Sequence, residues 1–286
     1  MQAVRTKVID IQNWTDFEGQ IRGLQNRRDV LKAENKRRFK ELLFRGLGNS
    51  DWGLETTLER SFPLDRSDMT LSLLAYYRKI LTVRPAVATL TEQRWFDIPD
   101  YPKFAKLLKS SKSRWLDRIL GDHVGVYRFM IYLRHHHFPS PLLDWTASPY
   151  VAALFAFDSM PANATHVCVY AFLQDTITTF DSKGHMFVVG PYIEAHRRHF
   201  LQQSRYSMCV AANGNDYSFL PHETTMGGAH YKNGELFKIR IPASERTSAL
   251  AHLDLMNINA YSVLGSEESL IRSIARRECL FKSWEV

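Results

Sequence analysis

Long apolar runs are missing from this sequence. No stretch of eighteen or more residues is continuously apolar, and a helix needs about that length to cross a membrane. The N-terminal segment MQAVRTKVIDIQNW also carries charges where a secretory signal would have its apolar core. We therefore expect a soluble protein that is not exported and is located in the cytoplasm.

Cysteine and the common catalytic motifs are also scarce. Cys168, Cys209 and Cys279 are odd in number and far apart, so they predict neither a disulfide framework nor a paired-cysteine zinc site. A reducing compartment fits this usage, and we expect no bound metal ion. The sequence has no P-loop, no GxSxG elbow and no HExxH motif, so no strong generic motif identifies its chemistry.

Positive charge is in excess. The 37 lysine and arginine residues outnumber the 30 acidic residues, which gives a formal net charge of +7. A basic protein favours acidic partners such as nucleic acid or phosphorylated cofactors. Arg28, Lys32, Lys36 and Lys40 recur every fourth residue, which on a helix forms a basic stripe. We interpret this stripe as a solvated helix face in preference to a nucleic-acid contact surface.

The periodicity of the apolar residues predicts one α+β domain over residues 1–286. A capping-box spacing at Thr15 begins a helical N-terminal extension that runs to about Lys40. Further helices are predicted over 69–82, 123–134 and 149–157, with surface helix and loop over 99–112, and strands at ELLFRGLG, HVCVYAFL, MFVVG, RYSMCVA and ELFKIRI. Ser148-Pro149 places a hydroxyl at the N-cap and a proline at the first position of the helix over 149–157, and Ser244 and Ser266 are expected to cap C-terminal helices. Because helices precede most strands without regular alternation, we expect a mixed or antiparallel sheet.

The first group of candidate functional residues is Phe44-Arg45-Gly46. Arg45 follows ELLF on a predicted buried strand, and Gly46 opens the turn beyond it. A buried guanidinium needs an anionic or carbonyl partner, and its planar fork suits a diphosphate. A structural salt bridge to a carboxylate such as Asp144 explains the same pattern equally well.

The second group lies in HHHFPSPLLDWTASP at 135–149. Polar density between two apolar helices suggests the wall of a site. Adjacent histidines at 135–137 point in different directions on a helix, which makes a metal site there a weak interpretation. Asp144, Thr146 and Ser148 could line a pocket, or could be ordinary capping residues.

The third group lies in RHFLQQSRYS at 198–207. Gln202, Gln203 and Tyr206 lead into an apolar strand, where side chains two apart share a face. An exposed edge strand would give the same pattern. Glu235, at a turn before a strand, is a further ambiguous acid. Glu267 and Glu268 are explained by the preference of a helix N-terminus for acidic residues.

These three groups, in this order, resemble the FRG domain, a family named for its Phe-Arg-Gly signature. Residues 44–46 supply the signature, and WGLETTLER at 52–60 is similar to the segment that follows it. RHHHFPSPLLDWTASPYVAALFAF at 134–157 resembles the family's most distinctive block, with its Leu-Leu-Asp-Trp-Thr core, and HRRHFLQQSRYS resembles a later glutamine-bearing element. In the distinctive block, Pro141 stands where the family pattern has an arginine, which removes a charge that could pair with Asp144.

The layout is also similar to the three-part arrangement of ADP-ribosyltransferases. That similarity implies an ADP-ribosyltransferase-like core that uses NAD as substrate. It assigns the diphosphate to Arg45 and Gly46, helped by Arg60, and the riboses and nicotinamide to His135, Thr146 and Ser148. The catalytic candidates are then Arg45, His135, Asp144, Gln203 and Tyr206. The third strand lacks the glutamate that such enzymes use, and Asp144, followed by Glu235, is the substitute.

The resulting hypothesis is transfer of ADP-ribose from NAD to a macromolecule, either nucleic acid or protein. A toxin or antiphage effector, with an antitoxin or inhibitor protein as partner, fits this activity. Two alternatives remain open at this point: a non-catalytic module that senses a nucleotide or nucleic acid, and a ribonuclease that acts through His135 without NAD.

Overall fold

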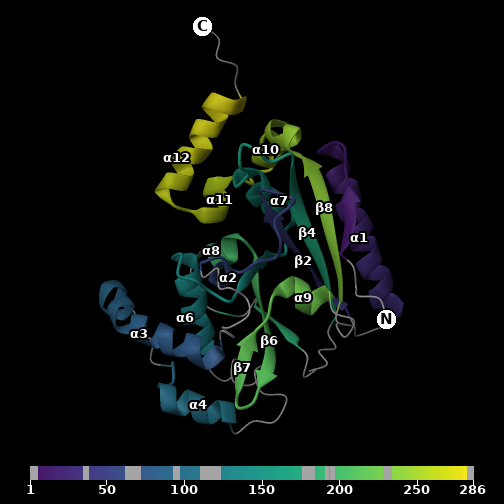
Figure 1. Ribbon diagram of the computed structural model, residues 1–286. Coiled ribbons are helices and arrows are strands. Elements are labelled where there is room, and N and C mark those ends of the chain that lie inside the picture. Colours follow the sequence, from purple (N-terminus) through teal and green to yellow (C-terminus); the bar gives the residue numbers. More distant parts are fainter. Residues whose placement is uncertain are drawn as a thin grey trace.

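The computed structural model describes residues 6–34, 39–61, 72–92, 97–109, 124–175, 184–190, 193, 197–227 and 234–281 (Figure 1). A mixed sheet runs through the molecule, and helices pack around it. The strands are β1 (Lys7–Asp10), β2 (Phe39–Leu47), β3 (Leu143–Thr146), β4 (His166–Asp175), β5 (His185–Val189), β6 (Ser204–Asn213), β7 (Asp216–Phe219) and β8 (Gly234–Pro242).

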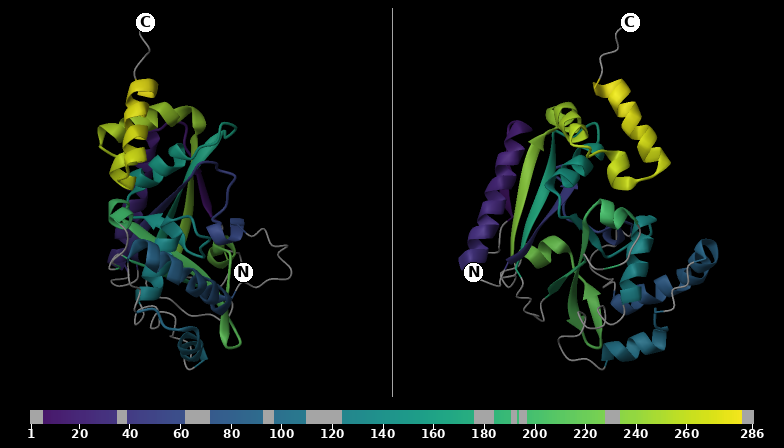
Figure 2. Two further views of the ribbon diagram at one scale, coloured as in Figure 1. Left: turned by 90° about the vertical axis from the view of Figure 1, so that its left-hand side faces the viewer. Right: turned by 180° about the vertical axis from the view of Figure 1, so that it is seen from behind.

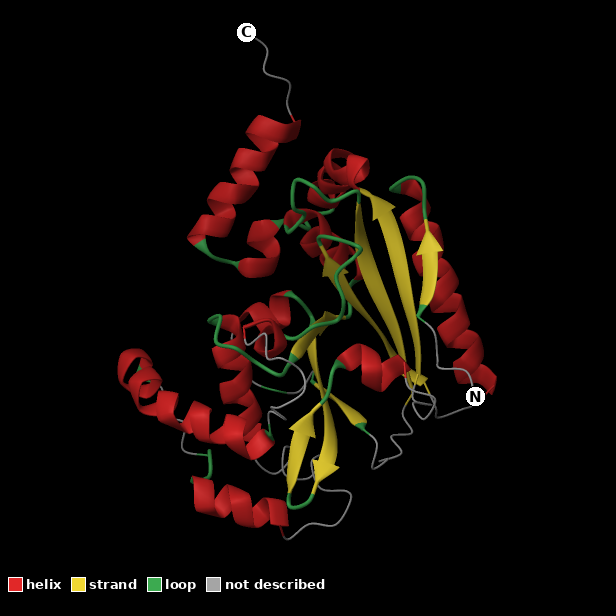
Figure 3. Cartoon of the chain, in the orientation of Figure 1, coloured by secondary structure: helices red, strands yellow, loops and turns green. Residues whose placement is uncertain are grey.

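The sheet has eight strands in the order β1-β8-β4-β2-β3-β6-β5, with β7 paired to β6. The β1–β8 pair is parallel, and the other strand pairs are antiparallel. The two halves of the sheet meet where β2 pairs with β3, at Phe44 opposite Thr146. In Figure 3 the long strands of one half lie above the β6–β7 hairpin of the other. The predicted functional residues on β2 and β3 therefore come together at this junction.

Helices cover the sheet in two groups (Figure 2). The helices are α1 (Thr15–Glu34), α2 (Thr57–Ser61), α3 (Leu73–Thr91), α4 (Tyr101–Lys109), α6 (Val124–His135), α7 (Pro149–Asp158), α8 (Arg197–Leu201), α9 (His222–Gly227), α10 (Arg246–Leu255), α11 (Ala260–Leu264) and α12 (Glu267–Arg276), with a 3₁₀ turn at Ala243–Glu245 and a π-helical turn at Arg277–Phe281. Helices α1, α7 and α10 bury one face of β2, β4 and β8. Helices α3, α4 and α6 form a second core with β6, and a third cluster fills the opposite face of β2 and β4.

Most predicted elements are confirmed, with shifts at their ends. The N-terminal helix ends at Glu34 and not near Lys40, because β2 already begins at Phe39. The extension is also not purely helical, since β1 pairs with β8 at the edge of the sheet. The helix predicted over 69–82 begins at Leu73 and continues to Thr91, and its predicted start at 69–71 lies outside the described residues. Strands β1, β3 and β7 were not predicted; each is four residues long.

Two of the predicted helix caps are confirmed and one is wrong. The Ser148 and Ser266 hydroxyls accept hydrogen bonds from the backbone N–H groups of Val151 and Ser269. Ser244 lies inside the 3₁₀ turn, and α10 begins after Glu245 without a side-chain cap. No helix in the described part of the chain is long and apolar enough to cross a membrane.

The predicted basic stripe is described only in part. Arg28 and Lys32 lie on α1, where Arg28 pairs with Asp29 and Lys32 is exposed. Lys36 and the side chain of Lys40 lie outside the described residues.

Candidate functional site

A cavity of about 430 Å³ opens at the junction of β2 and β3. The ends of α6 and α7 and residues of α8 complete its wall. The charged and imidazole residues that line it are Arg45, Arg60, Arg134, Arg198, Asp144, Asp158, His135 and His137, and the aromatic residues that line it are Phe44, Trp52, Trp145 and Phe155. Arginines thus outnumber carboxylates in the wall, and aromatic rings lie beside them.

Arg45 enters this cavity because side chains alternate along β2. Phe44 is buried in the cluster beneath α7, so Arg45 points to the other face of the strand. Its Nη1 donates a hydrogen bond to the backbone carbonyl of Asp144 at 2.8 Å and lies 3.9 Å from a carboxylate oxygen of the same residue. Its Nε is buried and has no hydrogen-bond partner among the described residues. This guanidinium is therefore incompletely satisfied.

The electrostatics of Arg45 agree with this geometry. Burial lowers the pKa of Arg45 to about 10; the Asp144 carboxylate opposes this shift, and Arg134 and Arg60 add to it. The guanidinium remains charged at neutral pH despite this lowered pKa. A buried cation next to other cations favours an anion in the adjacent space.

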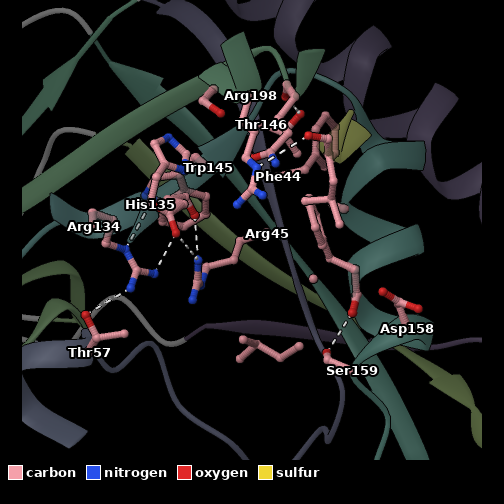
Figure 4. Close-up of a pocket in the computed structure, with 18 of the residues that line it drawn as sticks. Phe44, Arg45, Thr57, Arg134, His135, Trp145, Thr146, Asp158, Ser159 and Arg198 are labelled. Carbon is pink, nitrogen blue, oxygen red and sulfur yellow. Dashed lines mark hydrogen bonds and ion pairs between the residues drawn. The ribbon is translucent and has the colours of Figure 1, made fainter. Parts of the chain in front are cut away.

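Asp144 is held by another arginine. Arg134, at the end of α6, donates from Nε and Nη2 to the two carboxylate oxygens at 3.2 and 2.5 Å, and from Nη1 to the Thr57 hydroxyl at 2.9 Å. Figure 4 shows the guanidinium groups of Arg134 and Arg45 on the same side of the cavity. Burial alone would raise the pKa of Asp144, but Arg134 and then Arg45 outweigh it and lower the pKa. Asp144 is therefore a paired carboxylate anion.

His135 and Tyr206 form a second polar contact beside the cavity. The Nε2 of His135 lies 3.0 Å from the Tyr206 hydroxyl, which also lies 3.3 Å from Nδ1 of His199. His135 lines the cavity, whereas Tyr206 is fully buried behind it. Burial, followed by the Asp144 charge, raises the pKa of Tyr206. Tyr206 therefore supports His135 from behind and remains a neutral phenol.

The hydroxyl-bearing residues Thr146 and Ser148 differ in their position relative to the cavity. Thr146 lines the cavity, and its hydroxyl donates to the Gln202 carbonyl at 2.6 Å. Ser148 does not line the cavity, because its hydroxyl caps α7. Gln202 lines the cavity, while the Gln203 side chain is exposed, since Gln203 has a φ of 48° in the turn before β6.

The remaining predicted residues divide between the cavity and other regions. Arg60 and Gly46 line the cavity. Gly46 is also a packing requirement, because a Cβ at this position would overlap the carbonyl oxygen of Ala152 in α7. Glu235 is not in the cavity wall; its carboxylate binds Arg27 at 2.5 Å and lies 3.5 Å from Nζ of Lys7. Glu235 therefore lies outside the candidate site.

Arg134, Thr57, Trp52 and Arg198 line the cavity but had no role in the sequence-based site. Arg134 supplies the charge that the Pro141 substitution removes from the family pattern, from a position ten residues before Asp144. In the sequence, its position next to three histidines was the one feature that could have indicated a place in the site. Among the described residues there is no cluster of three or more His, Cys, Asp or Glu side chains that could hold a metal ion.

Comparison with known proteins gives one match. No curated protein and no solved structure matches the chain. The model of the FRG domain matches residues 40–165, a range that runs from β2 to the start of β4. It includes the Phe44-Arg45-Gly46 signature, Arg134 and the Asp144 turn, and so covers most of the charged wall of the cavity. Because the signature and most of the charged wall fall within that match, residues 40–165 of this chain are similar to the FRG domain.

Proposed function

We propose that the cavity binds NAD through its diphosphate and that the protein transfers ADP-ribose from NAD to a macromolecular acceptor. The observation that carries the proposal is the buried Arg45 guanidinium, whose Nη1 reaches a backbone carbonyl and whose Nε has no hydrogen-bond partner in the part of the chain that the structure describes. A diphosphate oxygen at this position would satisfy both the charge and the free donor.

The balance of charge in the wall supports an anionic ligand. Asp144 is bound by Arg134, and Asp158 is bound by Arg272 and Arg276. Arg45, Arg60 and Arg198 add positive charge to the same wall. With both wall carboxylates engaged in ion pairs, the cavity favours a ligand that carries more than one negative charge, as a diphosphate does.

Aromatic side chains support a nucleotide over a simple phosphate. Trp52 lines the cavity and is 43% exposed, and Phe155 lies in the same wall. An exposed tryptophan ring offers a face on which adenine or nicotinamide can stack. The layout also agrees with the ADP-ribosyltransferase resemblance, because Arg45 on β2 and Thr146 on β3 line one cavity.

The proposed reaction breaks the bond between ribose C1′ and the nicotinamide nitrogen. Nicotinamide leaves with the electron pair, the acceptor nucleophile bonds to C1′, and the acceptor's proton passes to His135. Arg45, with Arg60, holds the diphosphate, while Thr146 contacts a ribose. Asp144 is a positioning residue, because its carboxylate orients Arg134 and lies beside Arg45. The basic net charge favours nucleic acid as the acceptor.

One observation favours a second candidate function, a nucleotide sensor without catalysis. The oxocarbenium-like transition state of glycosidic cleavage needs negative charge beside the ribose. Asp144 and Asp158 are both paired with arginines. The cavity is therefore better suited to bind a diphosphate than to stabilise the ribosyl cation. A sensor would need only to bind the diphosphate.

Incubation with NAD separates the two functions. We expect wild-type protein to release free nicotinamide, measured by chromatography, and to label nucleic acid or protein when the adenine of NAD is tagged. Arg45→Ala should abolish both, while Arg27→Ala, which removes a surface arginine paired with Glu235, should change neither. NAD binding without nicotinamide release would identify the sensor. Failure of the folded wild-type protein to bind NAD would rule out the proposed reaction and a sensor of NAD.

A further inference from the structure

Helix α12 packs on the protein with its polar face and exposes its apolar face. Ser269 and Ser273 are its buried side chains, at 2% and 3% exposure. Leu270, Ile271 and Ile274 are 37%, 60% and 43% exposed. A surface helix of a globular protein normally shows the reverse arrangement. Figure 1 shows α12 at the edge of the molecule, beside α11.

Specific polar contacts fix this orientation. The Ser273 hydroxyl accepts a hydrogen bond from the backbone N–H of Tyr261 at 3.0 Å and donates to the Ser269 carbonyl at 2.9 Å. Arg272 and Arg276 both bind Asp158 at the end of α7. The polar face is therefore the face that is built to contact the rest of the chain.

Arg277, immediately after α12, binds Asp254 on α10 through two hydrogen bonds of 2.7 and 2.9 Å. Together with the Asp158 pairs, this contact holds both the middle and the end of the helix. A rotation of α12 that buried Leu270, Ile271 and Ile274 would break these ion pairs. The ion pairs therefore keep the apolar side chains exposed.

We propose that Leu270, Ile271 and Ile274, called here the α12 stripe, pack against the same stripe of a second copy of this chain. The stripe is apolar and continuous along one side of a helix, which is the pattern of a helix-pairing surface. In a two-fold symmetric dimer each surface meets itself, so the two helices run antiparallel.

The charges at the ends of α12 fit that antiparallel pairing. The first turn carries Glu267 and Glu268, and Arg276 and Arg277 lie at its C-terminal end. With the two-fold axis at Arg272, Leu270 lies opposite Ile274 of the partner subunit, and Glu267 lies opposite Arg277 of the partner subunit. Arg277 is 44% exposed beside its Asp254 pair, so its charge also faces the proposed contact. Opposite charges then meet at both ends of the apolar contact. The exposed acidic turn is unfavourable for an anionic membrane surface, which distinguishes a second copy from a lipid partner.

The dimer should be weak, because one short helix from each subunit buries less area than a stable interface needs. Sedimentation equilibrium over a wide range of concentrations should show a reversible monomer–dimer equilibrium for the wild type. Ile271→Glu should raise the dissociation constant about tenfold or more, because it places a charge at the centre of the contact. Leu90→Glu replaces a leucine that is 86% exposed on α3 and should leave the constant unchanged.

Glu267→Lys tests the orientation, since it would place like charges together at each end and weaken the dimer. Melting temperatures of all three variants should match the wild type, because the changed side chains are exposed. A wild type that is monomeric at every concentration overturns the proposal, as does a dimer insensitive to Ile271→Glu. Co-sedimentation of monomeric wild type with anionic phosphatidylserine vesicles would assign the stripe to a membrane instead. The result is independent of NAD, because these side chains are not in the cavity wall.

Discussion

Arg134 binds both carboxylate oxygens of Asp144, at 3.2 and 2.5 Å, across the turn that connects α6 to β3. This ion pair determines which contacts the neighbouring Arg45 makes. Because the carboxylate is occupied by Arg134, Arg45 reaches it at 3.9 Å and makes its hydrogen bond to the backbone carbonyl of Asp144. The cavity therefore combines a satisfied ion pair with an incompletely satisfied guanidinium.

The Arg134–Asp144 pair should make stability depend on pH. The pKa of Asp144 is lowered in the folded protein, so the pair stabilises the fold above the unfolded pKa of about 3.9, and this contribution is lost as the pH falls toward the folded pKa. Arg134→Met should cost about 2 kcal/mol of unfolding free energy at neutral pH, less than for a fully buried pair, since Asp144 is 34% exposed. Urea unfolding at neutral pH and at successively lower pH measures this cost. If Arg134→Met lowers the unfolding free energy in acid as much as at neutral pH, the ion pair with Asp144 is not the source of the effect.

Gly46 should be required for the packing of α7 on β2. Gly46→Ala would place a methyl group against the carbonyl oxygen of Ala152, so we expect a loss of about 3 kcal/mol in unfolding free energy. Gly19→Ala is the matched control, because Gly19 lies in α1 with no atom within 4 Å of the added methyl group. That change should stabilise the protein by about 0.5–1 kcal/mol. Thermal melts of both variants measure the contrast, and equal effects of the two changes would be inconsistent with this packing.

Trp52 should stack on the ligand. We expect Trp52→Ala to weaken NAD binding by about tenfold and Trp52→Phe to weaken it much less, because base–aromatic stacking contributes about 1–3 kcal/mol. Leu90→Ala, which removes another exposed apolar side chain, should have no effect. Titration by calorimetry gives the three constants. If Trp52→Ala binds NAD as tightly as the wild type, the ligand does not contact this ring.

Local sequence signals predicted much of the fold. Ser148-Pro149 located the start of α7, and β-branched and aromatic runs located β4 and β8. By contrast β3 was not predicted as a strand, because four residues are too short for a periodicity signal. Its strand character comes from pairing with β2 and β6, whose partner residues lie far away in the sequence.

The candidate site was predictable in outline and not in its contacts. The FRG signature and the Asp-Trp-Thr block identified two walls of the cavity, and Arg45 and Asp144 both line it. The role of Arg134 depends on the turn that brings the end of α6 back to β3, which no sequence spacing encodes. The same holds for the two glutamines, because a single turn residue at φ 48° decides that Gln202, and not Gln203, faces the cavity.

Direct binding of ADP-ribose to wild type and Arg45→Ala, measured by isothermal titration calorimetry, tests the central claim. We expect the wild type to bind ADP-ribose and Arg45→Ala to bind it about ten- to a hundredfold more weakly, the loss expected for hydrogen bonds to a charged group. Thermal melts of this variant should show no large loss of stability, since the substitution removes a buried and incompletely paired cation. Arg27→Ala should bind like the wild type. Equal affinity of wild type and Arg45→Ala for ADP-ribose would show that Arg45 does not hold the diphosphate.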